Sequence, residues 1–522
     1  MTRKRMSEFT RRLALYCLAI LALTACTSVE TYSNQEQLEK ISIYSFDRQD
    51  YQLHDDRVLQ YMEQQIKLDI EINTGVWDDS QIDVLIAAGD YPDVITIVDS
   101  DNYGRMNKWI RDGKLVPLTE ELTKGLPYLQ QVLADKRLSD LKINGNFYGL
   151  PIQDELPMNS PGQHVLIIRQ DWLKALHLDN PETLAELEQV LIAFKKGDPD
   201  GNQLHDSYGI IANGLTSIVK QLMGAWGIPV DARSTGFLQV GDHYEYWAIQ
   251  PEVKEALAYV KKLYDQKLIH PDTLSASSNV QIRPRFIEGR TGVMIDNPNF
   301  EELIKKEEQL QRSIRQAELA ILAAPAGPTG KRGYSVGSGY WGYTVITDRA
   351  KNPRAAAELL NYLLSEEGEQ LTLYGVPDVH YKEVDGKKQL ILEERGKDIG
   401  FHSATAGAPH ELNWGIVSWS RMTEEPYLQL RDQSIPHFSA KVNENLEQLT
   451  KHLVYSAAYH ITTPEWIAFK TNSEQLYDEY FNKIIRGQLG VDSGFAEFLE
   501  KWKSSGGEQA MQEMSDAIGA NQ

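Results

Sequence analysis

Residues 78–98 read DDSQIDVLIAAGDYPDVITIV, and this stretch carries the pattern that decides the fold. Its first half predicts a helix, Gly89 predicts a turn, and the β-branched run VITIV predicts a buried strand. The preceding segments ISIYSF (41–46) and KLDIEIN (67–73) predict two strands, with a helix at RVLQYMEQQI (57–66) between them. Strands that alternate with helices in this order are typical of an α/β domain with a mainly parallel sheet.

The same alternation continues through the middle of the chain. HVLIIRQDWL (164–173) predicts a strand that runs into a helix, and FIEGRTGVMID (286–296) predicts a helix end followed by a buried strand. Thr183 and Glu186 have the spacing of a capping pair at the start of an amphipathic helix. The roughly 480 residues after residue 40 are too many for one hydrophobic core, so we expect at least two lobes.

The N-terminal segment predicts export. MTRKRMSEFTRR (1–12) is basic, LALYCLAILALTA (13–25) is apolar, and Cys26 follows at once. The apolar run is shorter than the ~20 residues that a membrane-spanning helix needs. The tetrapeptide LTAC that ends at Cys26 resembles the lipobox of bacterial lipoproteins, in which the cysteine is acylated and becomes the first residue of the mature chain. An ordinary cleaved signal is the alternative.

We therefore predict a lipoprotein signal peptide at 1–25 and a flexible tether at 26–40. Acyl chains such as palmitate on Cys26 would be the only membrane contact. Cys17 would leave with the signal, so the mature fold cannot depend on a disulfide. The net charge of −21 argues against nucleic acid as a partner and favours solubility outside the cell.

Several phrases occur together in an order that carries a family resemblance: LIAAGDYPDVI, INGNFYGLP, IIRQDWLKAL with PETLAEL, FKKGDPDGN, VKKLYDQKLIHPD, FIEGRTGVMI and LLSEEGEQLTLYGVPDVHY. The chain resembles the family 1 extracellular solute-binding proteins, distant relatives of maltose-binding protein, and especially their long oligosaccharide-binding subgroup. The resemblance implies a monomeric lipoprotein on the outer face of the bacterial cytoplasmic membrane. It would capture an oligosaccharide and deliver it to the permease subunits of an ABC transporter.

The resemblance also implies a two-lobe, periplasmic-binding-protein-like fold of type II, with a mainly parallel sheet in each lobe and the ligand cleft between the lobes. Lobe one would comprise 41–155 and 336–390, and lobe two would comprise 156–335 and 391–522. Hinge closure of such lobes on a ligand suits a capture protein.

Sequence patterns typical of enzymes lack the neighbouring residues or elements that their active sites need. HELNW (410–414) begins like the zinc motif H-E-x-x-H, but Trp414 stands where the second His is required. GSGYWG (337–342) matches G-x-G-x-x-G, yet a predicted strand follows it instead of the helix that a dinucleotide site needs. No motif selects a carboxylate pair of a glycosidase. We predict a protein that is not an enzyme; a glycoside-active enzyme and a glycan-sensing or scaffold lipoprotein are the alternatives.

Sugars are bound by aromatic rings against their C–H faces and by polar side chains around their hydroxyls. Loops that follow predicted strands, the two predicted crossings between lobes and the tryptophan-rich segment NWGIVSWSR offer such groups. Each aromatic residue has the alternative of a place in the core, which we predict for Trp109 and Trp172, whereas Trp341 and Trp419 are favoured for the cleft. The predicted ligand-binding residues are Phe46, Asp47, Arg48, Asp99, Asp101, Gln153, Asp154, Trp226, Asp296, Asn297, Asn299, Phe300, Tyr340, Trp341, Trp414, Trp419 and Arg421.

The segment DPDGNQLHD has the oxygen-ligand spacing of an EF-hand-like calcium loop, with structural Ca²⁺ as the predicted cofactor. Related members of the family carry calcium at this phrase. Gln203 replaces the usual Gly of the loop, and Ser207 stands where the subgroup has Glu, so a plain turn is the alternative. The predicted ligands are Asp198, Asp200, Asn202, Leu204 and Asp206.

Overall fold

The computed structural model describes residues 38–45, 56–74, 80–98, 104–135, 138, 141–143, 145–153, 164–204, 206–230, 234–337, 339–398, 410, 412, 416–417, 424–459 and 461–520. The chain divides into two units, Met1–Lys40 and Ile41–Gln522. The predicted signal peptide, Cys26 and nearly all of the tether lie outside the described residues.

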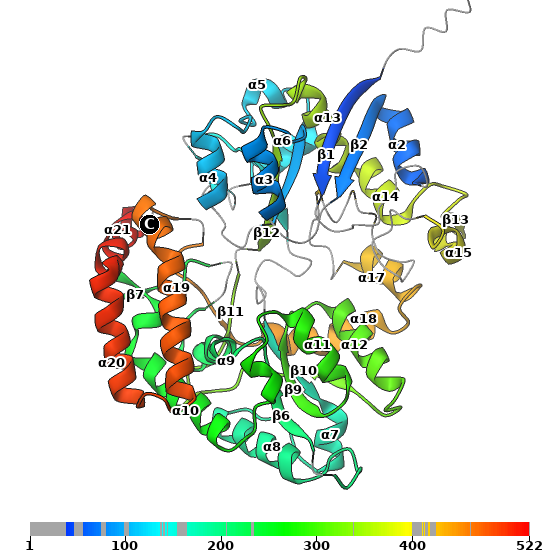
Figure 1. Ribbon diagram of the computed structural model, residues 1–522. Helices are drawn as coiled ribbons and strands as arrows, with labels where there is room; N and C mark the ends of the chain where they lie inside the picture. The colour runs from blue at the N-terminus through cyan, green and yellow to red at the C-terminus, as the bar shows by residue number, and fades with distance from the viewer. Residues whose placement is uncertain are drawn as a thin grey trace, which may run out of the picture. The chain divides into compact units, whose positions relative to one another are not determined.

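A five-stranded sheet forms the first lobe, in the order β2-β1-β3-β12-β4 (Figure 1). Strands β1 and β3 pair in parallel, whereas β12 pairs antiparallel with both β3 and β4. The strands are β1 (Glu39–Ser45), β2 (Leu68–Thr74), β3 (Val94–Val98), β4 (Leu150–Gln153) and β12 (Tyr340–Ile346). The helices of this lobe are α2 (Arg57–Ile66), α3 (Ser80–Ala88), α4 (Gly104–Arg111), α5 (Glu120–Thr123), α6 (Pro127–Leu133), α13 (Pro353–Leu363) and α14 (Glu366–Tyr374).

A four-stranded sheet forms the second lobe, in the order β10-β5-β9-β6. Strands β6 and β9 are parallel, and β5 is antiparallel to both of its neighbours. The strands are β5 (Val165–Arg169), β6 (Tyr208–Ile211), β9 (Thr291–Asp296) and β10 (Leu319–Ile321). The helices that precede residue 320 are α7 (Gln170–Ala175), α8 (Leu184–Lys196), α9 (Leu215–Leu222), η3 (Met223–Trp226), η4 (Trp247–Ile249), α10 (Pro251–Asp265), η5 (Pro271–Leu274), α11 (Asn279–Ile287) and α12 (Phe300–Gln311).

Helices from the end of the chain complete the second lobe, and α19, α20 and α21 lie side by side (Figure 1). Their bounds are α17 (Glu425–Asp432), α18 (Phe438–Thr450), α19 (Pro464–Ile485), α20 (Val491–Trp502), the π-helical turn η6 (Lys503–Gly507) and α21 (Glu508–Ala520). Three small pairs and one short helix remain: β7 (Phe237–Val240) with β8 (His243–Tyr246), β11 (Tyr334–Ser335) with β15 (Leu453–Val454), β13 (Tyr381–Val384) with β14 (Lys387–Leu390), and α15 (Leu392–Arg395).

Strand β5 shows why the second lobe needs helices on both faces of its sheet. All five of its residues are buried. Leu166 and Ile168 belong to the core on one face, and Val165 and Ile167 belong to the core on the other. This separation follows from the two-residue side-chain period of a strand. The predicted α/β lobes are confirmed, and so is the capping box of Thr183 and Glu186 at the start of α8.

Both sheets are mixed, which differs from the predicted mainly parallel arrangement. In the first sheet, β12 runs against both of its neighbours, and it comes from a distant part of the chain. In the second sheet, the strand that runs against its neighbours is β5, between β10 and β9. Neither strand is joined to its sheet neighbours by the short helical crossover that goes with parallel pairing, so either direction is open to it.

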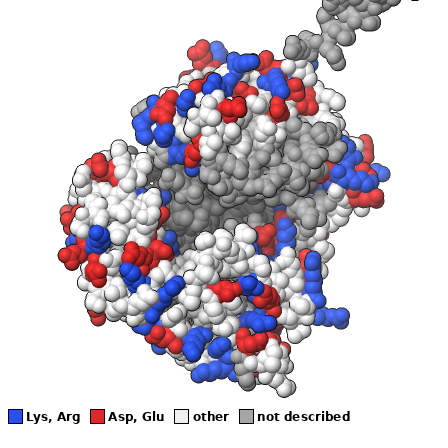
Figure 2. All heavy atoms as spheres, in the orientation of Figure 1, with Lys and Arg blue, Asp and Glu red and all other residues white. Residues whose placement is uncertain are grey.

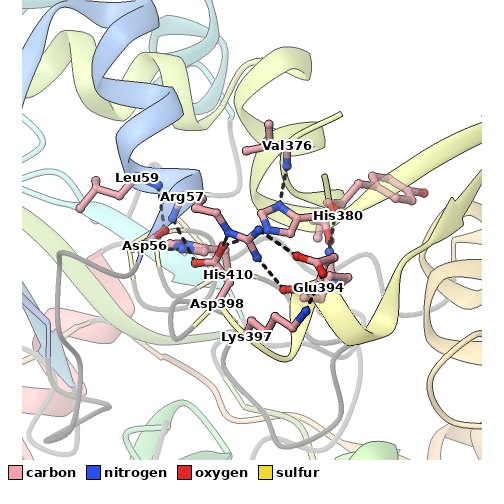
Figure 3. Close-up of polar contacts among 12 residues, drawn as sticks. Asp56, Arg57, Leu59, Val376, His380, Glu394, Lys397, Asp398 and His410 are labelled. Atoms are coloured by element: carbon pink, nitrogen blue, oxygen red, sulfur yellow. Dashed lines mark hydrogen bonds and ion pairs between the residues drawn. The ribbon is translucent and has the colours of Figure 1, made fainter. Parts of the chain in front are cut away.

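A buried ionic cluster joins α2 to the segment that follows α14 (Figure 3). Asp56 caps α2 by accepting a hydrogen bond from the Leu59 amide (2.8 Å), and its other carboxylate oxygen lies 2.8 Å from His410 Nε2. Asp398 accepts from Arg57 Nε at 2.9 Å, and the same oxygen lies 2.9 Å from His380 Nε2. The Asp398 and His380 side chains are fully buried, so this contact is shielded from water.

This cluster attaches residues beyond position 390 to the first lobe. Leu412, Ile416 and Val417 are buried in the core of the five-stranded sheet, and Thr344 donates a hydrogen bond to the Ile416 carbonyl (2.6 Å). The sequence boundary placed all residues after 390 in lobe two. The structure differs for Leu412, Ile416 and Val417, which lie in the first core, and no periodic pattern in the sequence reveals this placement.

Replacing Asp398 with Ala should destabilise the protein by about 3–5 kcal/mol, because it leaves the buried His380 without its carboxylate and removes one of the two carboxylates that pair with Arg57. Chemical denaturation would measure the change in the free energy of unfolding. Glu393→Ala is the control, since Glu393 is largely exposed and pairs only with Lys397 at the surface (3.2 Å). Its change should stay within about 0.5 kcal/mol. Equal effects of the two substitutions would contradict a role for the buried cluster.

Candidate functional site

A pocket of about 250 Å³ opens in the second lobe between α9, α19, the β7–β8 hairpin and the segment before it. Helices α9 and α19 are neighbours in the lobe (Figure 1). The residues that line the pocket are His164, Asn213, Ser217, Lys220, Gln221, Val230, Ser234, Thr235, Gly236, Tyr246, Trp247, Ser335, Trp466, Lys470, Glu474 and Tyr477.

The amphipathic pattern of α9 places its polar residues in the pocket. Leu215, Ile218, Val219 and Leu222 are buried in the core of the lobe. The opposite face of the same helix carries Ser217, Lys220 and Gln221, which therefore point away from the core and line the pocket.

Helix α19 presents a second row of side chains to the pocket. Trp466, Lys470, Glu474 and Tyr477 recur every three or four residues, so they share one face of the helix. Trp466 and Tyr477 are buried at the level of the core, whereas Lys470 and Glu474 are partly exposed. One helix face thus supplies both aromatic and charged groups.

Two aromatic pairs form the wall of the pocket. The ring centroids of Tyr246 and Trp466 lie 4.7 Å apart, and those of Trp247 and Tyr477 lie 5.2 Å apart, both in edge-to-face geometry. Burial raises the pKa of both Tyr246 and Tyr477, so their hydroxyls stay protonated at neutral pH. The wall is therefore apolar on its ring faces, and its two tyrosine hydroxyls remain uncharged.

Several polar groups of the pocket already form hydrogen bonds within the protein. Ser335 Oγ accepts a hydrogen bond from the Val230 amide (2.6 Å), and Thr235 Oγ1 donates to the Ala458 carbonyl (2.7 Å). Asn213 differs, because its side-chain oxygen is buried and has no hydrogen-bond partner among the described residues. A hydroxyl group of a bound molecule would satisfy this oxygen.

A sequence profile described as bacterial extracellular solute-binding protein matches residues 55–370, more than half of the chain. The chain belongs to this family of solute-binding proteins. The matched range begins before α2 and ends within α14, so it includes both sheets of this solute-binding protein apart from β1.

Curated relatives cover most of this solute-binding protein. Lipoprotein LipO of Bacillus subtilis is 27% identical over 452 residues, which are 83% of each chain. The polygalacturonan/rhamnogalacturonan-binding protein YtcQ of the same organism is 26% identical over 479 residues, 89% of this chain and 88% of YtcQ. The fructooligosaccharide ABC transporter substrate-binding protein FusA of Streptococcus pneumoniae is 26% identical over 310 residues, 53% of this chain and 56% of FusA.

Among solved structures, the alginate-binding protein AlgQ2, determined without calcium ion, superposes with a TM-score of 0.69. The alignment covers 92% of this solute-binding protein and 97% of AlgQ2 at 20% sequence identity. The two-lobe fold class is thereby confirmed. None of the described helices is both long and apolar enough to cross a membrane.

Many of the predicted ligand-binding residues lie outside the part of the chain that the structure describes. The side chains of Gln153 in β4 and Trp341 in β12 are among them, although their strands are described. These two residues and the following ones stay predictions: Phe46, Asp47, Arg48, Asp99, Asp101, Asp154, Trp414, Trp419 and Arg421.

The predicted residues that are described lie in the cores or in local turns, and none of them lines the pocket. Trp226 is buried and donates from Nε1 to Glu255 (2.8 Å). Phe300 and Tyr340 are buried in the cores of the second and first lobes. The predicted core residues Trp109 and Trp172 are confirmed as buried.

Asp296 and the turn after it form ion pairs and hydrogen bonds within the second lobe. Arg283 Nε and Lys306 Nζ lie 2.9 and 3.1 Å from Asp296 Oδ2. Burial opposes ionisation of Asp296, yet these two cations lower its pKa below the ordinary value. Asn297 accepts a hydrogen bond from the Asn299 amide (2.8 Å), and Asn299 in turn caps α12. The turn is thus held by its own hydrogen bonds.

The predicted calcium loop follows α8 and brings its carboxylates together. Asn202 Nδ2 donates to Asp200 Oδ2 (2.9 Å) and to Asp206 Oδ1 (3.1 Å). Asp198 accepts from the Gln203 amide through one oxygen, whereas its other oxygen is buried without a hydrogen-bond partner among the described residues. Burial and the neighbouring Asp198 raise the pKa of Asp200.

Gln203 adopts φ = 63°, the left-handed conformation that Gly provides in calcium loops, while the Leu204 side chain is exposed. The loop therefore keeps the sharp turn without the Gly. Across the described residues, no three His, Cys, Asp or Glu side chains gather in a way that could hold a metal ion. Metal binding here would depend on the Asn202 amide and on backbone carbonyl oxygens as well.

The residues that line the pocket were missed by the sequence reasoning. Lys220 and Gln221 belong to an ordinary amphipathic helix, and Trp466 and Tyr477 belong to another one about 250 positions later, by the sequence numbering. The spacing of Trp466, Lys470, Glu474 and Tyr477 on one helix face is the only signal in the sequence. That spacing shows that the four residues share one face of the helix, but it does not show which part of the protein this face contacts.

Proposed function

We propose that this solute-binding protein captures an oligosaccharide outside the cell and releases it, unaltered, to the permease of an ABC transporter. The observation that carries the proposal is the pocket of the second lobe, where paired aromatic rings stand beside the polar faces of α9 and α19. Aromatic walls suit the C–H faces of sugar rings, and amide, hydroxyl and ammonium groups suit their hydroxyls. The pocket volume is below the ~300–1,000 Å³ of typical ligand sites, so it would hold one part of a longer chain.

The related proteins support the same role. The name of FusA assigns it to an ABC transporter for fructooligosaccharides, and the name of YtcQ assigns it the binding of polygalacturonan and rhamnogalacturonan. Family membership supports an extracellular site, and likeness to the lipoprotein LipO supports acylation at Cys26 after removal of 1–25. The acyl chains would tether the protein to the outer face of the cytoplasmic membrane.

Calorimetry of the purified full chain against a panel of oligosaccharides should detect binding, and chromatography should recover the bound sugar intact. New reducing ends in the recovered sugar would instead indicate a glycoside hydrolase. Absence of binding across the panel would leave the scaffold alternative and contradict capture.

Asn213→Ala should weaken binding of the captured oligosaccharide by about three- to tenfold, because a hydrogen bond worth roughly 0.5–1.5 kcal/mol is lost. Asn180→Ala is the matched control, since Asn180 is an exposed residue of the same lobe that accepts only from Gln170. The dissociation constants come from titration calorimetry. Unchanged affinity of the Asn213 variant would remove this residue from the binding site.

We also propose that the loop after α8 binds Ca²⁺ as a structural ion. Asp198, Asp200, Asn202 and Asp206 offer hard oxygen ligands, and the Leu204 carbonyl adds another. The buried, unpartnered oxygen of Asp198 supports the fit, as do the two carboxylates that converge on Asn202. A bound cation would neutralise these carboxylates and brace the connection from α8 to β6. AlgQ2 was solved without calcium ion and FusA as an EF-hand mutant, which is consistent with this role.

Millimolar Ca²⁺ should raise the melting temperature of the protein relative to a sample in chelator. At a hundredfold excess of ion over the dissociation constant, the added stability is about 2.7 kcal/mol. Asp200→Ala should abolish the difference, whereas Asp242→Ala, a fully exposed aspartate of the same lobe, should keep it. A wild-type melting temperature that is the same in calcium and in chelator would mean that the loop is a plain turn.

A further inference from the structure

The pocket contains an ammonium group that its surroundings leave unpaired. Lys220 makes no hydrogen bond or ion pair with any described residue, and its Nζ lies over the face of Tyr477, 4.8 Å from the ring centroid. The core residues on the other side of α9 hold the backbone of Lys220 in place. The packing of α9 therefore fixes the point from which the Lys220 side chain extends into the pocket.

The carboxylates nearby do not compensate this charge. Burial lowers the pKa of Lys220, even though Glu474 and Asp478 act in the opposite direction. Asp478 is occupied, because it accepts hydrogen bonds from Thr216 (2.6 Å) and Asn482 (3.1 Å). Among the described residues that line the pocket, Lys470 is a second lysine and Glu474 is the carboxylate.

The two lysines that line the pocket belong to a chain that is acidic overall. The chain carries a net charge of −21, and acidic and basic side chains are intermingled on the surface that Figure 2 draws. The net charge therefore repels an anionic ligand at long range, so any selection of an anion must come from groups in the pocket. A half-buried ammonium costs free energy unless it gains a partner, so the pocket is poised for a group that supplies negative charge.

We propose that the pocket selects an acidic sugar, with the carboxylate of a uronic acid unit bound at Lys220 and the sugar ring against the aromatic wall of Trp247 and Tyr477. The inference rests on the proposed capture of an oligosaccharide and names the class of that ligand. The side-chain ammonium donates to the carboxylate, and Lys470 strengthens the positive potential around it. Neutral sugars of the same shape would leave the Lys220 charge unpaired in a closed pocket.

The test uses the full chain and three acidic probes: oligogalacturonate, oligoalginate and glucuronate-bearing xylo-oligosaccharides. Each probe is compared with its methyl ester, which keeps the shape and removes the charge. Wild-type protein should bind at least one acidic probe, with affinity that falls as salt rises, and should bind the ester about ten- to hundredfold more weakly.

Lys220→Met should weaken binding of the acidic probe by a similar factor without weakening binding of the ester. Lys254→Met is the control, because Lys254 is an exposed lysine of the same lobe that pairs with Asp492 (2.8 Å). Thermal melts check that the Lys220 variant folds, and Lys220→Gln replaces it if Met does not.

Two results would overturn the inference while capture itself stands: tighter binding of an uncharged oligosaccharide than of every acidic probe, or acidic binding that Lys220→Met leaves intact. Failure to bind any saccharide, charged or neutral, would instead overturn the proposed capture together with the inference.

Discussion

Edge-to-face packing between the β8–η4 turn and α19 supports both the second lobe and its pocket. Tyr246 and Trp247 lie against Trp466 and Tyr477, and Tyr246 further stacks on Trp502 at a centroid distance of 6.4 Å. Such pairs contribute roughly 0.5–1.5 kcal/mol each beyond the burial of their area. The same rings join the C-terminal helices to the core and form the wall of the site. A binding surface made of core residues is preorganised, so little ordering is needed when a ligand arrives.

The net charge of the chain and the local pairing of its charges have different effects in this protein. The chain as a whole is strongly acidic, which favours solubility outside the cell and keeps like molecules apart. Within the protein, several buried charges are paired, as Asp296 is with Arg283 and Lys306. Lys220 departs from this rule. An unpaired ammonium in a pocket is unfavourable for the unbound protein and useful for selecting a ligand, which is the usual relation between stability and function at a binding site.

The two lobes are stabilised by different means at their irregular segments. In the first lobe, Asp56, Arg57, His380 and Asp398 bind the residues after α14 to the start of α2 (Figure 3). In the second lobe, the loop after α8 gathers Asp198, Asp200 and Asp206 around Asn202, where a cation would complete the arrangement. In both places, contacts between polar side chains add to the apolar packing of the helices and strands.

The sequence by itself determined the local elements and the family. The strands VITIV and VLIIR, the capping box at Thr183 and the apolar face of α8 are set by contacts within a few residues, so composition and period suffice to predict them. Ordered phrases along the chain were enough for the resemblance to solute-binding proteins. The mixed direction of both sheets, the place of Leu412 in the first core and the pocket were decided only by tertiary structure. Lys220, Trp247 and Trp466 meet across large separations in sequence, and no local pattern distinguishes a lysine that faces a pocket from one that faces water. Trp226 shows the converse: a Trp in a glycine-rich segment is buried because Glu255 accepts its indole N–H and the surrounding core covers its ring.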